Sequence, residues 1–234
     1  DLFGQPLIAD CQRGFVYSDC YTDDARLVIL NAQQAQGAGA TLLNYTKTTV
    51  QRQAKHWDIT LTRHGITQTT RAAIVINATG PWVKHVNETV IGIPLKTPMV
   101  LSQGSHIVVP KLYSGDHAYI LQNPDRRVIF VIPFHGYTLI GTTDSAFHAD
   151  PSLAHISDEE IDYLCHSIGF YFAKPLTPAH IVWSYSGVRP LLLDGDGSNL
   201  AQVTRDYSHE VNDDGAPLIS VIGGKLTTYR RLAQ

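Results

Sequence analysis

The stretch AAIVINATGPW, residues 72–82, decides the fold class of this chain. Its first six residues form an apolar run that ends in Asn77, which is typical of a strand buried on both faces of a parallel sheet. Gly80 then breaks the strand, and Pro81 suits the first turn of a helix. A second apolar run, APLISVIGG, occupies residues 216–224. The two runs predict an α/β layer whose strands come from distant parts of the sequence.

The residues around the first run predict a helix followed by strands. Thr22, Asp23 and Asp24 suit a helix start, and the helix is expected to end at Gly37. Strands are expected at 41–45, 47–53, 57–63 and 66–79, with a hairpin turn at His64–Gly65. The stretch GAGATL, residues 37–42, begins like a dinucleotide fingerprint. It lacks the third glycine and follows a helix, so it indicates a helix end and a tight turn.

The character of the chain changes after about residue 95. Short apolar strands separated by turn signals predict an antiparallel meander, with strands at 105–111, 118–123, 128–134 and 138–144. Ser157 and Glu160 form a capping-box signature that opens an amphipathic helix, which is expected to continue to Pro175. Further strands are expected at 183–193 and 201–207. The fold class is therefore mixed α/β, with a Rossmann-like layer and an antiparallel sheet.

Composition excludes several classes of protein. The chain has 234 residues, a formal net charge of −3 and 44% hydrophobic residues, which is typical of a globular protein without a nucleic-acid footprint. No run of about 18 apolar residues predicts a membrane-spanning helix. The three cysteines are widely spaced, which favours reduced thiols in a cytoplasmic protein. The histidines lack metal-ligand spacing, so no metal site is expected.

Two motifs in the second half carry arginines. In SGVRPL, residues 186–191, Arg189 lies in an apolar stretch, where an unpaired guanidinium is costly to bury. It either pairs with a carboxylate such as Asp206 or receives an anionic ligand, and Arg205 has the same two interpretations. With His106, the two arginines would form a receptor for a small phosphate. By itself His106 is more typical of a core or turn histidine.

Lys225 follows Gly223 and Gly224 at a predicted helix start. A cation is unfavourable at a helix N-terminus, so this local conflict favours an anionic ligand or a reactive centre nearby. Backbone donors from Lys225 to Thr228 would line the same turn.

Eight stretches follow in a consistent order over residues 10–234: RGFVYSDCYTDDARLV, NATGPWV, GSHIVVP, AYILQN, IGTTD, VWSYSGVRPL, TRDY and GGKLTTYR. As a set they resemble the FAD-dependent, membrane-associated glycerol-3-phosphate dehydrogenases of the bacterial aerobic type. The resemblance implies part of a FAD-binding domain at 1–95, a substrate domain at 96–215 and a return to the FAD-binding domain at 216–234. The family's first G-x-G-x-x-G unit and its C-terminal helical domain do not appear here. An internal part of a longer enzyme, inactive alone and binding FAD weakly, is therefore expected.

The resemblance also assigns roles to residues. It implies that Arg189 and Lys225 lie near the reacting carbon and the flavin, and that Arg205, Arg189 and His106 surround the substrate. His106 or Lys225 is an easier proton acceptor than Arg189, and the choice stays open. The expected cofactor contacts are Thr49, Val50, Gly80, Gly187, Gly223, Gly224, Lys225, Leu226, Thr227 and Thr228.

The activity implied for the complete enzyme is oxidation of sn-glycerol 3-phosphate to dihydroxyacetone phosphate, with hydride transfer to FAD. Electrons would pass to a quinone, and the enzyme would lie at the inner face of the cytoplasmic membrane as a peripheral protein. The alternatives are a flavoenzyme for another small hydroxy acid or amine, or a non-catalytic anion-binding module. Unpaired sheet edges could also pair two copies as a homodimer.

Overall fold

The computed structural model describes residues 5–193 and 206–234. The chain forms two compact units, each assembled from two separate stretches. Unit 1 comprises residues 1–16 and 100–190, and unit 2 comprises residues 17–99 and 191–234. Three sheets and several helices confirm the predicted mixed α/β class. The predicted roles of the parts 1–95, 96–215 and 216–234 in FAD and substrate binding stay predictions.

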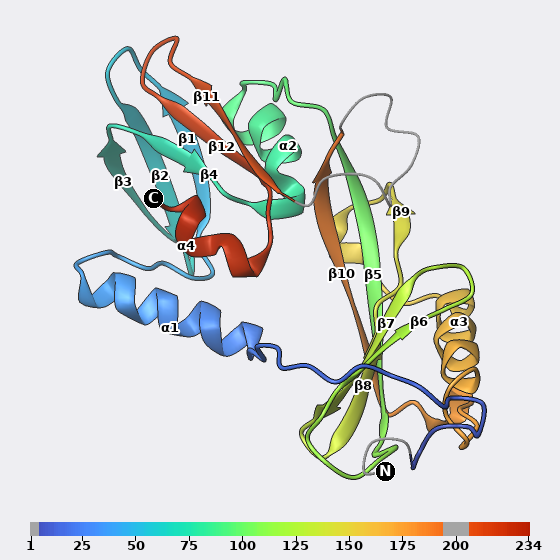
Figure 1. Ribbon diagram of the computed structural model, residues 1–234. Helices are drawn as coiled ribbons and strands as arrows, with labels where there is room; N and C mark the ends of the chain where they lie inside the picture. Colours follow the sequence, from blue (N-terminus) through green and yellow to red (C-terminus); the bar gives the residue numbers. More distant parts are fainter. Residues whose placement is uncertain (1–4, 194–205) are drawn as a thin grey trace. The chain divides into compact units, whose positions relative to one another are not determined.

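Unit 1 is built on an antiparallel sheet of order β10-β5-β8-β7-β6, with β9 pairing with β5 (Figure 1). Three of the four strands of the predicted meander, β6, β7 and β8, pair in sequence, and His135 and Gly136 take positive φ in the β7–β8 hairpin. The first predicted strand lies in β5 and pairs with β8, not with β6, so the prediction is wrong at that strand. The strands are β5 (Met99–Pro110), β6 (Tyr119–Gln122), β7 (Val128–Phe134), β8 (Tyr137–Gly141), β9 (Ser145–Phe147) and β10 (Trp183–Leu192). Two short 3₁₀ turns, Pro151–Leu153 and Pro178–His180, complete this unit.

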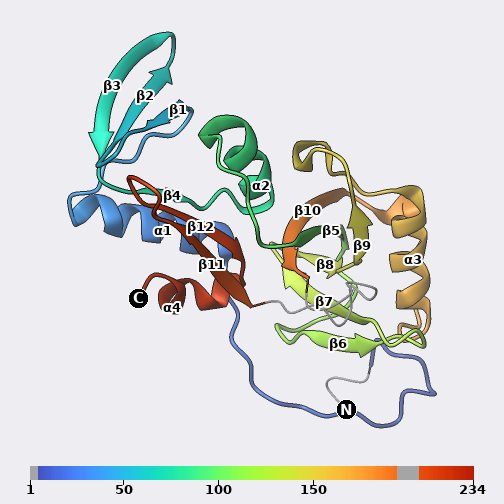
Figure 2. The same cartoon turned by 90° about the horizontal axis from the view of Figure 1, so that it is seen from above.

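Helix α3 (Asp158–Gly169) runs along one face of this sheet (Figure 1, Figure 2). The predicted capping box is confirmed, with Ser157 Oγ accepting from Glu160 N. The apolar side of α3 packs against one face of β5, β7 and β8. The buried core between them includes Leu164, Cys165 and Ile168 of the helix and Ile107, Val109, Val131 and Ile140 of the strands. The predicted end at Pro175 is wrong. The helix ends at Gly169 because the following residues turn back, where Phe172 bridges to Leu7.

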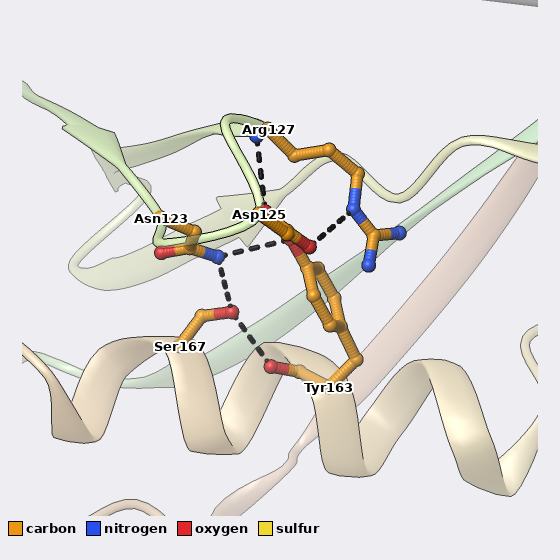
Figure 3. Close-up of polar contacts among 5 residues, drawn as sticks. All are labelled: Asn123, Asp125, Arg127, Tyr163 and Ser167. Carbon is orange, nitrogen blue, oxygen red and sulfur yellow. Dashed lines mark hydrogen bonds and ion pairs between the residues drawn. The ribbon is translucent and has the colours of Figure 1, made fainter.

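A polar cluster ties the β6–β7 turn to α3 (Figure 3). Asn123 Nδ2 donates to Tyr163 Oη at 3.0 Å and to Ser167 Oγ at 2.6 Å. The Arg127 guanidinium lies 3.8 Å from the Tyr163 ring centroid, and its Nε donates to Asp125 at 2.7 Å. Burial would raise the pKa of Asp125, but hydrogen bonds from Arg127 outweigh it and hold that pKa below its usual value.

Unit 2 holds two three-stranded sheets, of order β1-β2-β3 and β11-β12-β4. The two apolar runs, which are predicted to belong to one α/β layer, form β4 and β12, and these strands pair in parallel. The strands are β1 (Lys47–Arg52), β2 (Trp57–Arg63), β3 (Ile66–Ala72), β4 (Val75–Asn77), β11 (Tyr207–Asn212) and β12 (Leu218–Gly223). The helical elements are α1 (Asp24–Gly37), a 3₁₀ turn (Gly80–Trp82), α2 (Val83–Val86), a π-helix (Asn87–Ile91), a 3₁₀ turn (Leu226–Thr228) and α4 (Tyr229–Leu232).

The two sheets of unit 2 meet at Trp57, which is fully buried with Ala216 and Leu218. Trp57 Nε1 donates to the Pro217 carbonyl at 3.0 Å. Arg52 donates from Nε to the Ala216 carbonyl at 2.7 Å, and its guanidinium lies 5.4 Å from the Trp57 ring. The end of β1 and the start of β2 are thereby joined to residues more than 150 positions later.

Three sequence predictions in unit 2 are wrong. Residues 41–45 form no strand, since Tyr45 has a left-handed φ of 52°. The single strand expected at 66–79 is split after Ala72. The run at 72–77 is not buried on both faces, because Ile74 and Ile76 are 49% and 61% exposed. In the described part of unit 2, the helical segment after β4 covers only the face to which Asn77 points.

The predicted end of α1 needs a small correction. The helix does end at Gly37, but the left-handed residue of the cap is Gly39, with φ 98°. Gly39 N donates to the Gln36 carbonyl and Ala40 N to the Ala35 carbonyl, which satisfies the last turn. Residues 201–205 of the strand expected at 201–207 lie outside the described residues.

Candidate functional site

The two faces of the unit 1 sheet differ in character. Along β5, Gln103 and Ser105 point to α3, as their hydrogen bonds to Glu160 show. Successive strand residues alternate between faces, so Gly104 and His106 lie on the opposite side. We call that side the His106 face. It carries the arginine, histidine and aromatic side chains described next.

Arg189, on β10, lies against a glycine of β5. A Cβ on Gly104 would lie within 2.6 Å of both terminal guanidinium nitrogens and of Thr142 Oγ1. Arg189 Nη2 donates to Thr142 Oγ1 at 3.2 Å. The guanidinium therefore occupies the space that any other residue at 104 would fill, and it is partly exposed on the His106 face.

His106 is placed by two neighbours on the same face. His106 on β5 lies opposite Gly141 on β8. A Cβ added to Gly141 would come within 2.8 Å of three atoms of the His106 imidazole ring. The ring stacks on Tyr185 of β10, with centroids 4.8 Å apart and an interplanar angle of 5°. Stacking on one side and a glycine below fix the plane of the imidazole. Ser102, two residues before Gly104, donates a hydrogen bond to Asp144.

The arrangement brings together two of the three residues predicted to bind substrate, Arg189 and His106. The third, Arg205, lies outside the described residues. The sequence interpretation missed Gly104, Gly141, Thr142 and Tyr185 as parts of the site. A glycine inside a strand pattern is the available signal for the first two, because it often marks a close approach of another group.

The turn after β12 belongs to unit 2. Gly223 and Gly224 have φ of 72° and 104°, which places both in the region that favours glycine. The predicted helix start is confirmed. Thr228 Oγ1 accepts from Lys225 N at 3.3 Å and donates to the Lys225 carbonyl at 2.8 Å. Residues from Gly224 to Thr227 are exposed, so this turn is open to a ligand.

Strand β4 pairs with β12, the strand that precedes this turn. Buried amide side chains hold the end of β4 in place. Asn77 Nδ2 donates to the Val83 carbonyl at 2.9 Å and to Asn87 Oδ1 at 2.7 Å. Asn87 Nδ2 donates to Ser220 Oγ of β12 at 3.0 Å. Gly80, with φ 58°, begins the turn that follows, and a Cβ there would meet open space. The end of β4 is therefore rigid while its turn stays accessible.

The other predicted cofactor contacts lie apart in the chain. Thr49 is exposed on β1, and Val50 is partly buried against the core around Trp57. Gly187 is exposed on β10, and a Cβ there would meet nothing within 4 Å. Their roles, like those of Gly80 and of residues 223–228, stay predictions.

Within residues 5–193 and 206–234, no group of three or more His, Cys, Asp or Glu could hold a metal ion. In the same residues, no helix is both long enough and apolar enough to cross a membrane.

Comparison with known proteins extends these observations. A family model described as FAD dependent oxidoreductase, DAO, matches residues 2–230. A glycerol-3-phosphate dehydrogenase of Pseudomonas aeruginosa is 46% identical over 98% of this chain and 46% of that protein. A D-erythritol 1-phosphate dehydrogenase of Brucella abortus is 44% identical over 99% of this chain and 47% of that protein. The chain spans about half the length of these relatives.

A solved structure is similar as well. The glycerol-3-phosphate dehydrogenase of Bacillus halodurans, complexed with FAD, is 31% identical with a TM-score of 0.74. The likeness covers 91% of this chain and 41% of that chain. The two units described above thus occur together in a larger flavoprotein.

Proposed function

This chain belongs to the FAD dependent oxidoreductase family, and on that premise we propose that it serves the oxidation of sn-glycerol 3-phosphate to dihydroxyacetone phosphate. In this proposal the His106 face of unit 1 receives the substrate, and the turn after β12 in unit 2 receives part of FAD. The observation that carries the proposal is the placement of Arg189 against Gly104, two residues from His106 on the same face. Relatives named for phosphorylated polyols support it.

A phosphorylated polyol suits the His106 face. A phosphate dianion needs cationic donors, and a guanidinium offers paired N–H groups in a fixed fork. Arg189 is held by Thr142 while remaining partly exposed. Arg205 would be the second cation of the receptor. Polar groups near Arg189 would form hydrogen bonds with the hydroxyls of a polyol, and His106 is the best placed of these groups.

The residues present also fit FAD. Gly80, Gly223 and Gly224 have positive φ, so their turns carry no side chain that would block a close ligand, and residues 224–227 are exposed. Lys225 adds a positive charge at the turn. Residues 223–228 would hold the ring and its adjoining chain, while Gly80, Thr49 and Val50 would border the nucleotide part. When bound, FAD supplies the acceptor for a hydride from C2.

The residues of this chain would then act as follows. Arg189 orients the substrate and stabilises negative charge that develops on its C2 oxygen. His106 takes the proton of the C2 hydroxyl, because its ring lies on the same face and is held in one plane by Tyr185. Lys225 stabilises negative charge near the ring. Gly187 keeps β10 free of a side chain beside Arg189.

The test uses the protein that carries this chain, loaded with FAD and kept free of oxygen. Addition of sn-glycerol 3-phosphate should bleach the visible flavin band in a single turnover, whereas glycerol at the same concentration should not. Equal bleaching by both compounds would overturn the assignment of a phosphorylated substrate. Bleaching only by an amino acid or a 2-hydroxy acid would favour the alternative flavoenzyme.

A second candidate substrate has a specific observation behind it. The Brucella abortus relative named for D-erythritol 1-phosphate is 44% identical, close to the value for the Pseudomonas aeruginosa relative. The two substrates share the phosphate and differ in the length of the polyol. Comparing kcat/KM for D-erythritol 1-phosphate with that for sn-glycerol 3-phosphate in the same protein decides between them.

We propose that the electron acceptor is a quinone. We also propose that the protein lies at the inner face of the cytoplasmic membrane as a peripheral protein. Their support is the resemblance to aerobic glycerol-3-phosphate dehydrogenases, such as the Escherichia coli relative at 44% identity. Reoxidation of the reduced protein by a soluble quinone, with and without phospholipid vesicles, tests both parts. Measuring the molecular mass of the same preparation in solution tests whether the protein forms the expected homodimer.

A further inference from the structure

On the helix side of the unit 1 sheet, one carboxylate collects hydrogen bonds from several elements. Glu160, in the first turn of α3, accepts from Gln103 Nε2 at 2.9 Å and from Ser105 Oγ at 3.0 Å. It also accepts from Thr143 Oγ1 and from Ser157 N, the latter at 3.0 Å. The carboxylate is half-buried, and all these donors come from unit 1. A helix cap alone needs only the Ser157 contact.

The donors on Glu160 are direct neighbours of the substrate-facing residues. Ser105 lies between Gly104 and His106 in β5. Thr143 follows Thr142, the partner of Arg189. Because strand residues alternate in direction, fixing Ser105 from the helix side fixes the orientation of Gly104 and His106 on the other side of β5. Thr143 lies just after β8, where fixing it limits the backbone position of the adjacent Thr142.

The network also reaches β10. Ser105 Oγ lies 2.8 Å from Ser186 Oγ, and Ser186 stands next to Tyr185 and three residues before Arg189. Ser105 gives its single proton to Glu160, so Ser186 is the donor between the two hydroxyls. Ser105 N donates to Thr143 Oγ1 at 2.8 Å, and Thr143 N donates to the Ser105 carbonyl at 3.2 Å. The three segments that carry His106, Thr142 and Arg189 are thus linked through this carboxylate.

We propose that Glu160 is a positioning residue for the reaction: its carboxylate, acting through Ser105 and Thr143, holds His106 and Arg189 in their productive arrangement from the opposite side of the sheet. This inference rests on the proposed function of the His106 face. Hydrogen bonds to an ionised carboxylate are about twice as strong as neutral ones, which suits a residue that must fix three segments at once. Displacement of a catalytic group by as little as 1 Å can cost about a hundredfold in rate.

The experiment compares two variants of the FAD-loaded protein that carries this chain. Glu160→Gln keeps the size of the side chain but replaces one acceptor oxygen with a donor. Ser157→Ala removes the other half of the capping box and leaves the carboxylate, so it is the matched control for weakening α3. Glu160→Gln should lower kcat for sn-glycerol 3-phosphate about tenfold with a smaller change in KM, and Ser157→Ala should change kcat less than twofold.

Amide hydrogen exchange supplies a readout that does not depend on turnover. Glu160→Gln should raise the exchange rates of the Ser105 and Thr143 amides at least tenfold, and Ser157→Ala should leave both near the wild-type values. A third variant, Ser105→Ala, leaves the capping box intact and should lower kcat severalfold.

Equal kcat and equal exchange rates in Glu160→Gln and Ser157→Ala would overturn the inference, as would an unchanged kcat in Ser105→Ala. These outcomes are distinct from failure of the proposed function. If the wild-type protein is not reduced by sn-glycerol 3-phosphate, the proposed function fails, while the exchange rates still report whether Glu160 holds the two segments.

Discussion

At the residue scale, Gly104 decides where Arg189 can lie. The guanidinium and the Thr142 hydroxyl fill the volume that a Cβ would need at position 104. Gly141 does the same for the His106 ring. Two missing side chains therefore create the room in which the cation and the imidazole reach the same face of the sheet.

We predict that Gly104→Ala lowers kcat/KM for sn-glycerol 3-phosphate about tenfold to a hundredfold, because Arg189 must leave its place. Overpacking of this kind costs about 1–3 kcal/mol. Gly169→Ala is the control, since a Cβ at the end of α3 meets nothing within 4 Å. Steady-state kinetics of both variants provide the measurement. Wild-type kinetics in Gly104→Ala would show that Arg189 does not act from this position.

At the element scale, β4, β12 and the helical segment after β4 are joined by Asn77, Asn87 and Ser220, all buried. Buried amides without partners are costly, so this chain of bonds sets how β4 and β12 meet the helix. It also determines where the Gly80 turn and the Gly223–Gly224 turn begin.

We predict that Asn87→Ala lowers the free energy of unfolding by about 1–3 kcal/mol, and that Ser220→Ala lowers it by about 1 kcal/mol. Because the two side chains contact each other, the double variant should lose less than the sum of the single losses. Urea unfolding of the three variants measures this coupling. Strictly additive losses would contradict the network.

Much of this element-level structure could be predicted from sequence. The strands β4 and β12, the hairpin-linked strands β6, β7 and β8 and the capped helix α3 follow from apolar runs, turn residues and the Ser157–Glu160 spacing. The exposure of Ile76 could not be predicted, because composition does not tell which face of a strand another element covers. The strand expected at 41–45 failed because a left-handed residue, Tyr45, overrode its β-forming residues.

The site was only partly predictable for a related reason. Arg189 and His106 were found as charged or titratable residues in apolar strands. Tyr185 and Thr142 gave no signal, since their roles arise from register between strands that are distant in sequence. Glu160 was recognised as a cap, and only its hydrogen bonds reveal the second role that we infer for it.

At the scale of the whole molecule, the chain leaves unit 2 after Met99 and returns at Leu191. Glu210 of β11 holds the segment that leads out of unit 2. Its carboxylate accepts from Lys96 N at 3.0 Å and from Thr97 N at 2.7 Å. Burial would raise the pKa of Glu210, but these backbone and hydroxyl donors outweigh it and lower that pKa below 4.5.

This lowered pKa predicts a pH-dependent contribution to stability. The contribution is fully present above the unfolded pKa and is lost as pH falls through the folded pKa. Glu210→Gln should therefore lower the thermal midpoint near neutral pH, and the difference from wild type should shrink as pH drops below about 4.5. A difference that stays constant with pH would contradict this role. Thermal melts over the same pH range measure it.

The most direct measurement of the central claim, that Arg189 on the His106 face acts on a phosphorylated polyol, is single-turnover flavin reduction in the FAD-loaded protein. Arg189→Lys keeps the charge but loses the planar fork and the reach toward Gly104 and Thr142. The reduction rate with sn-glycerol 3-phosphate should fall at least about a hundredfold, or about 2.7 kcal/mol. An unchanged reduction rate in Arg189→Lys would contradict the account.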